Sequence, residues 1–474
     1  MPDVEQLMHK NSSLTERLPL PTRETLPPEL VSIAEAIAEL TGTWNPVELY
    51  TPGNAQEEKT RFVESFLADK EYNPVFTYPY AEQFSLGDTR QRLKDFLHQV
   101  RGFEPKGQID RLGRVALRYK IKDDLATLDL IEGLQQKDEE KISRSLAQKY
   151  QGVNDQLWQT AQEIYEMRLF GQHKVPSGQG SINEVEQGAL SAREFSAEEI
   201  ASALQWALKE YGMFREDSQH SGFAVTVDEK TTSIDVRDKS AKGPTVFIPK
   251  QKKMNGIELL KLIGHEIEGH ARQSINGERL FLIGGGSLKV DDETLYEGLA
   301  KRNDDQLSQS LFGTEEGIPI PHYTYAVRDA MQGKSFSEIF QGQLEMRLRE
   351  SLNMPLTEPA PQRSNIPEKI LQKAMDQAWM TTFRVMRGHV DTSNKRAFAM
   401  TKDLSYLQGW LLDRQLRKHG LGHLNEAAII ARGGLQLLTE FQLSESDLPL
   451  PYRDIATRYW QEVLKPQLSG NFLR

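Results

Sequence analysis

The sequence predicts an α+β fold that is mostly helical and contains one small sheet. Over most of the 474 residues, apolar side chains recur every three or four positions, which is typical of amphipathic helices. Three short stretches, 223–229, 232–238 and 245–250, instead alternate apolar and polar residues and are rich in Val, Ile, Phe and Thr, as strands are. A helical pattern resumes directly after the third stretch and carries two histidines.

The chain divides into three segments. We expect an extended arm and a helical region over 1–190, a domain with the sheet and the two histidines over 191–440, and a C-terminal helix packed on this core over 441–474. Residues 171–183 are rich in Gly, Ser and Pro, which predicts a linker or a loop. Soon after it, "SAEE" has the pattern of a capping box and predicts a helix that starts at Ser196.

The composition excludes several classes of protein. A net charge of −10 without a long basic block argues against nucleic acid and anionic membranes as partners. No apolar run is long enough for a membrane span, and the N-terminus has no apolar signal core, so we expect a cytoplasmic location. The chain has no cysteine, so any metal must be held by His, Asp or Glu. The oligomeric state stays open.

The stretch "GHEIEGHARQ" places His265, Glu266 and His270 in the spacing H-E-x-x-x-H. The familiar zinc-protease motif is H-E-x-x-H, with both histidines on one helix face. Residues five apart on an α-helix point about 140° apart and cannot share a metal. A π-bulge brings them together, and Gly269 lowers its cost, so we expect the helix to be widened here. Two ordinary histidines, or other pairs such as His265 with Glu268, remain alternatives.

A third metal ligand is expected from the next helix. The glycine triplet 284–286 permits a sharp reversal, and "DDETLYEGLAKRN" predicts a helix with Asp291 or Asp292 as N-cap. Glu297 then lies one turn into this helix, and two helices joined by a loop are how His-His-Glu zinc sites obtain their carboxylate. Asp292 and Glu293 are the competing ligands.

These residues resemble the microtubule-associated tyrosine carboxypeptidase family and its bacterial relatives. The resemblance rests on "HEIEGH", "NG", "GGG", "DDE" and "YEGLA", where Tyr296 replaces the family's Gln, and it spans roughly 200–430. A later stretch resembles the family's R-x-x-R-G and K-D-x-x-Y-x-x-G, although the insertion between these two motifs departs from the compact family version. The matching positions there are Arg384, Arg387, Gly388, Lys402, Asp403, Tyr406 and Gly409.

The resemblance implies a zincin-like (gluzincin) metallopeptidase core and the activity of a zinc carboxypeptidase. Its substrate would be the C-terminal tail of a protein or peptide. The family's zinc (Zn2+) ligands match His265, His270 and Glu297. Glu266 would be the general base that takes a proton from water and passes it to the leaving amine.

The same chemistry needs two further kinds of group. Negative charge that develops on the attacked carbonyl must meet a hydroxyl or a cation, for which the candidates are Tyr406, Arg387, His322 and His389. A free C-terminal carboxylate fits a guanidinium or an ammonium, for which the candidates are Arg384, Arg387 and Lys402. The resemblance favours Arg387, Lys402 and Tyr406 for the pocket. We expect Tyr406 to be a catalytic residue and all three cations to bind substrate.

Two questions stay open in the sequence. The stretch 245–250 is expected either to be an edge strand that pairs with the substrate backbone or only to pack the core. The alternative functions are a metal-binding module that recognises a partner without turnover, and a zinc endopeptidase. An intact Glu266 beside the ligands favours an enzyme, since a purely structural metal site has no use for a base.

Overall fold

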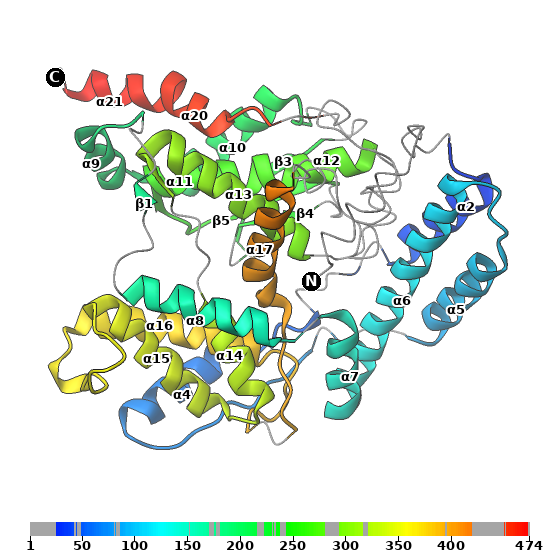
Figure 1. The fold of residues 1–474 in the computed structure, drawn as a ribbon, viewed down its shortest axis with the longest axis horizontal. Helices are drawn as coiled ribbons and strands as arrows, with labels where there is room; N and C mark the ends of the chain where they lie inside the picture. Colours follow the sequence, from blue (N-terminus) through cyan, green and yellow to red (C-terminus); the bar gives the residue numbers. More distant parts are fainter. Residues whose placement is uncertain are drawn as a thin grey trace.

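The fold is known from a computed structural model, which describes residues 25–41, 44, 49–79, 81, 86–150, 152–169, 175–176, 181–215, 222–229, 231, 234–237, 243–279, 293–315, 321–393, 396–419, 450 and 452–472. These residues form many helices and three small sheets, which confirms a mostly helical α+β fold (Figure 1). No helix within these ranges is both long enough and apolar enough to cross a membrane.

One hydrophobic core joins the N-terminal helices to helices from much later in the chain. Phe62 shows this link, because the centre of its ring lies 5.0 Å from the ring centre of Phe336 and 4.8 Å from that of Phe340. The early helices are α2 (Pro28–Thr41), α4 (Ala55–Leu67), α5 (Gly87–Gly102), α6 (Gln108–Gln136), α7 (Glu139–Lys149) and α8 (Asp155–Leu169). The later ones are α14 (His322–Met331), α15 (Phe336–Leu352), α16 (Glu368–Val385) and α17 (Ser405–Lys418).

A second hydrophobic core surrounds the helix with the two histidines. The predicted capping box is confirmed, since the side chain of Ser196 accepts the N–H of Glu199 and α10 begins at the next residue, Ala197. The domain boundaries at 190 and 440 stay predictions. The C-terminal helix described below contributes to this core, together with α9 (Glu184–Ala192), α10 (Ala197–Tyr211), α11 (Gly256–Leu262), the π-helix η2 (Ile263–Ala271), α12 (Arg272–Arg279) and α13 (Glu293–Phe312).

The predicted three strands form one sheet, but in an order that corrects one expectation. The strands are β3 (Ala224–Asp228), β4 (Asp235–Arg237) and β5 (Thr245–Pro249), in the order β3-β5-β4. β5 is therefore the central strand and not an edge strand, because it pairs in parallel with β3 and antiparallel with β4. The edge strand that lies against η2 is β4.

Two further sheets have two strands each. β1 (Val175–Pro176) pairs with β7 (Thr314–Glu315), and β2 (Glu194–Phe195) pairs with β6 (Met254–Asn255). β1 lies inside the stretch expected to be a linker, so this part of it is a short strand; residues 170–174 and 177–180 lie outside the described residues.

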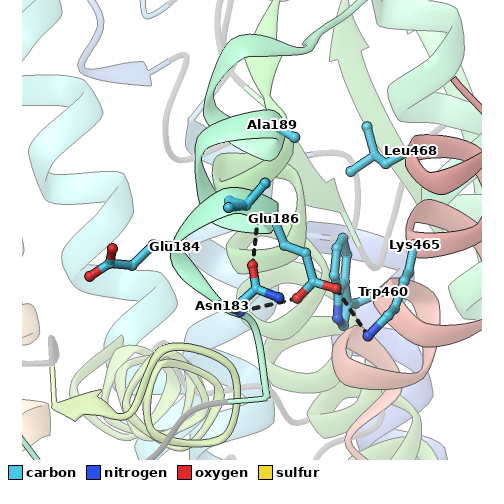
Figure 2. A pocket seen from close by; sticks show the side chains of 8 residues that line it. Asn183, Glu184, Glu186, Ala189, Trp460, Lys465 and Leu468 are labelled. Atoms are coloured by element: carbon cyan, nitrogen blue, oxygen red, sulfur yellow. Dashed lines mark hydrogen bonds and ion pairs between the residues drawn. The ribbon is translucent and has the colours of Figure 1, made fainter. Parts of the chain in front are cut away.

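The chain's last described helix combines α20 (Ile455–Tyr459), the π-helix η6 (Trp460–Leu464) and α21 (Lys465–Phe472). It lies against α9, where Lys465 forms a 3.0 Å ion pair with Glu186 (Figure 2). A pocket of about 460 Å³ lies between the two helices, and none of the residues expected to bind metal or substrate lines it.

Three helices cross at positions without bulky side chains. A Cβ atom on Gly269 would lie 3.2 Å from the Cα of Ala300, where η2 meets α13. A Cβ atom on Gly298 would lie only 2.6 Å from the carbonyl oxygen of Gly409, where α13 meets α17. α17 lies beside α13 in Figure 1, and the missing side chains allow this backbone-to-backbone approach.

The crossing of α13 and α17 predicts that Gly298→Ala destabilises the fold. The new methyl group overlaps a backbone oxygen that cannot move alone, so we expect a loss of about 1–3 kcal/mol in the free energy of unfolding. Gly188→Ala in α9 is the matched control, since a Cβ there meets nothing within 4 Å and helix propensity gains about 0.5–1 kcal/mol. Denaturant unfolding measures the free energy of unfolding of both variants. Equal changes in the two would contradict the close approach of α13 and α17 at Gly298.

Candidate metal centre

The helix that carries the motif is a π-helix at the expected place. η2 (Ile263–Ala271) contains both histidines, which confirms the predicted widening of the helix. Bonding from i to i+5 stacks residues five apart, so the rings of His265 and His270 lie on one side with their centroids 5.0 Å apart. The run begins with a capping box, in which Asn255 accepts the N–H of Glu258, and continues through α11 without interruption.

Glu297 completes a cluster with the two histidines. His265, His270 and Glu297 each offer one ligand atom, and these atoms all lie within 4.8 Å of one another. His265 Nε2 lies 3.7 Å from Glu297 Oε2, within the about 4 Å that two zinc ligands can span. Of the competing ligands, Asp292 and the side chain of Glu293 lie outside the described residues, as does the expected N-cap Asp291.

The residues of this cluster fit a divalent cation. Glu297 Oε2 is buried and has no hydrogen-bond partner within the described part of the chain. A buried carboxylate oxygen without a partner costs free energy, which a bound cation would offset. Two imidazoles and one carboxylate are also the donor set of catalytic zinc sites, which leave a further position open.

Asp304 supports the cluster from behind His265, and sequence reasoning missed it. Its Oδ2 lies 3.3 Å from His265 Nδ1 and accepts a 2.7 Å bond from Lys301. Metal-ligating histidines commonly use their second nitrogen in this way, which fixes the ring. The available signal was the spacing, because Asp304 follows Glu297 by two helical turns and so shares its face of α13.

The charges of the site shift its pKa values strongly. Burial alone would lower the pKa of His265, but the carboxylates of Asp304 and Glu266 raise it to about 9. Burial raises the pKa of Glu266 to about 7, opposed by His265 and reinforced by Glu297. Burial also raises the pKa of Glu297. Burial alone would raise the pKa of Asp304, but the nearby Lys301 and His265 lower it well below its ordinary value.

Glu268, which also lies between the two histidines, points away from the cluster. Its carboxylate is fully buried and accepts the hydroxyl of Tyr211 and the backbone N–H of Ile455, each at 2.9 Å. The alternative pair of His265 with Glu268 is therefore not brought together.

Tyr406 and Arg384 lie close to Glu297. The carboxylate of Glu297, together with burial, raises the pKa of Tyr406 well above its ordinary value. Arg384 and Lys402 both oppose the rise in the pKa of Glu297, so their charges also lie near it. Arg384 donates to the hydroxyl of Tyr323 at 3.2 Å, and its guanidinium lies 5.9 Å from the ring centre of Tyr406.

Arg384 and Arg387 differ in ways that their spacing does not show. Both pair with Asp403, Arg384 at 2.5 Å and Arg387 at 3.2 Å. The side chain of Arg384 is 29% exposed and that of Arg387 only 7%. Arg384 is thus the accessible cation of the two, and Arg387 supports Asp403 from the interior.

The two histidines considered for charge stabilisation lie elsewhere. His322 is buried, with Nε2 3.6 Å from Glu350, and burial lowers its pKa well below the ordinary value. His389 is buried and stacks on Phe398 with ring centres 3.7 Å apart, and burial lowers its pKa to about 3. Neither belongs to the cluster of possible ligands.

Comparisons of the sequence with known proteins give no independent support for a family. The chain matches no protein-family model, and no curated protein matches it. The resemblance stated from the motifs therefore stays a prediction.

The contact between Asp304 and His265 predicts how metal affinity depends on pH. Metal binds neutral imidazole, and His265 holds its proton up to about pH 9, so zinc affinity should rise from neutral pH toward pH 9. Asp304→Asn removes the charge that raises this pKa, so the rise should end at lower pH. The loss of support should also weaken binding by about 10- to 100-fold.

Zinc dissociation constants from chelator competition between about pH 6.5 and 9 measure both effects. Asp305→Asn is the control, since Asp305 neighbours Asp304 in sequence, whereas the carboxylates that raise the pKa of His265 most are those of Asp304 and Glu266. An Asp304→Asn protein with the wild-type pH profile would disprove the role of this contact.

Proposed function

We propose that this protein is a zinc-dependent metallocarboxypeptidase that removes residues from the C-terminus of a protein or peptide. The observation that carries the proposal is the cluster of His265, His270 and Glu297, with Glu266 beside it on the π-helix. The sequence resemblance to the tyrosine carboxypeptidase family supports the same activity. The proposed zinc ligands are the three residues of the cluster.

Zinc supplies a Lewis acid, which polarises a carbonyl oxygen and makes water a stronger nucleophile near neutral pH. Glu266 accepts the proton of the attacking water and delivers it to the leaving amine. Its pKa of about 7, raised by burial, suits a group that must both take and return a proton. Tyr406, held beside Glu297, donates its hydroxyl hydrogen to the developing negative charge.

Substrate recognition is assigned to the cations beside the cluster. Arg384 is the strongest candidate for the terminal carboxylate, because it is accessible and is oriented by Tyr323 and Asp403. Lys402 adds positive charge near Glu297, and Arg387 acts indirectly through Asp403. The edge strand β4 replaces β5 as the partner for an extended substrate backbone.

We propose a zincin-like arrangement for this centre, and a cytoplasmic site of action. We propose no nucleic-acid or membrane partner, in keeping with the net charge of −10. The main alternative is a zinc endopeptidase, and a metal-binding module without turnover is the second.

Paired peptides that differ only at the C-terminus test this function. We expect the protein to remove the last residue of a free-acid peptide and to cut the amidated form poorly, because Arg384 binds the carboxylate. Arg384→Ala should reduce kcat/KM for the free acid by about 10- to 100-fold, because it removes one charge-assisted hydrogen bond to the carboxylate. Mass spectrometry of the products measures both. Equal cleavage of the two forms would exclude a carboxypeptidase.

Two variants control this experiment. Arg396→Ala removes an arginine that is 54% exposed and pairs with Glu139 and Glu140, so it should leave both rates unchanged. Glu266→Gln should keep zinc but lose about 10²- to 10⁴-fold in turnover, as expected when a general base is removed. A Glu266→Gln protein with full activity would refute the assignment of the base.

A further inference from the structure

Glu268 connects the metal-binding helix to the C-terminal part of the chain. One carboxylate oxygen accepts the hydroxyl of Tyr211 and the N–H of Ile455, and the other accepts the N–H of Ala456 at 3.4 Å. Ile455 and Ala456 begin α20, where backbone N–H groups have no partner within their own helix. Glu268 therefore caps α20 from inside the H-E-x-x-x-H motif.

Other residues of the same helical run hold the chain just before α20. Asn276 forms two bonds with the backbone of Leu450, accepting its N–H at 2.7 Å and donating to its carbonyl at 3.0 Å. Arg272 donates to the carbonyl of Leu450 at 3.5 Å, and from a different helix, α10, Tyr211 accepts the N–H of Arg453 at 3.0 Å. All these contacts are buried or partly buried, so water competes with them weakly.

The far end of the C-terminal helix is also anchored. Lys465 pairs with Glu186 of α9, and Trp460 is buried in the second hydrophobic core (Figure 2). The helix that Glu268 caps is therefore held at both ends, and it can resist rotation of η2 about its axis.

We propose that Glu268 is a positioning residue of the metal centre, and that through it the start of α20, at Ile455 and Ala456, sets the orientation of His265 and His270. This inference rests on the proposed metal site. Side chains at 265, 268 and 270 extend from adjacent turns of one continuous π-helix, so a rotation that releases Glu268 from α20 also turns both imidazoles. The C-terminal segment thus contributes to metal affinity without contacting the metal.

Zinc affinity of full-length Glu268→Gln, measured by chelator competition, tests the inference. Glutamine keeps the shape but loses the charge that holds the two N–H groups, so we expect the zinc dissociation constant to rise about tenfold, as for other residues that support metal ligands. The visible spectrum of the cobalt-loaded protein should change as well, because it reports ligand geometry. Tyr211→Phe, which removes only one hydroxyl, should act in the same direction, and it decides the question if Glu268→Gln does not fold.

Glu258→Gln is the matched control. Glu258 lies on the same helical run and also accepts a backbone N–H, that of Asn255 at 2.9 Å, so its carboxylate caps α11, whereas that of Glu268 caps α20. It should lower stability while leaving zinc affinity and the cobalt spectrum unchanged. Wild-type zinc affinity in both Glu268→Gln and Tyr211→Phe would overturn the inference. Because the readout is binding and not turnover, this result would leave the peptidase proposal standing, and a zinc-binding protein without peptidase activity would leave the inference standing.

Discussion

Two imidazoles five residues apart can face one cation only where the helix between them is wound from i to i+5, and the rest of the site depends on this constraint. η2 meets it over the whole stretch Ile263–Ala271. A π-helix is rare and needs support from its surroundings. Here α13 supports it through the close approach of Ala300 to Gly269, and the C-terminal segment supports it through Glu268.

The acidic residues near this helix differ in the groups that they contact, and their roles follow from these contacts. Glu297 has a buried oxygen left for a cation, and Asp304 is committed to His265 and Lys301. Glu268 is committed to α20. Glu266, the proposed general base, has a pKa raised to about 7 mainly by burial. Several carboxylates can share so small a region because each has different neighbours.

The sequence predicted the features that depend on local geometry. The capping box at Ser196, the three strands and the widened helix follow from spacing within one element, and the structure has each of them. Features that depend on distant packing were not accessible. β5 was expected at an edge, but strand order is set by pairing between separate segments. Arg384 and Arg387 are equivalent in sequence, and only their packing around Asp403 distinguishes them.

Anomalous X-ray scattering at the zinc edge, from crystals grown with one equivalent of zinc, tests whether His265, His270 and Glu297 bind zinc together. We expect one strong peak at about 2.0–2.2 Å from a nitrogen of His265, a nitrogen of His270 and an oxygen of Glu297. His270→Ala crystals should lose this peak. A peak ligated by other residues, or a peak that persists unchanged in His270→Ala, would contradict the proposed metal centre.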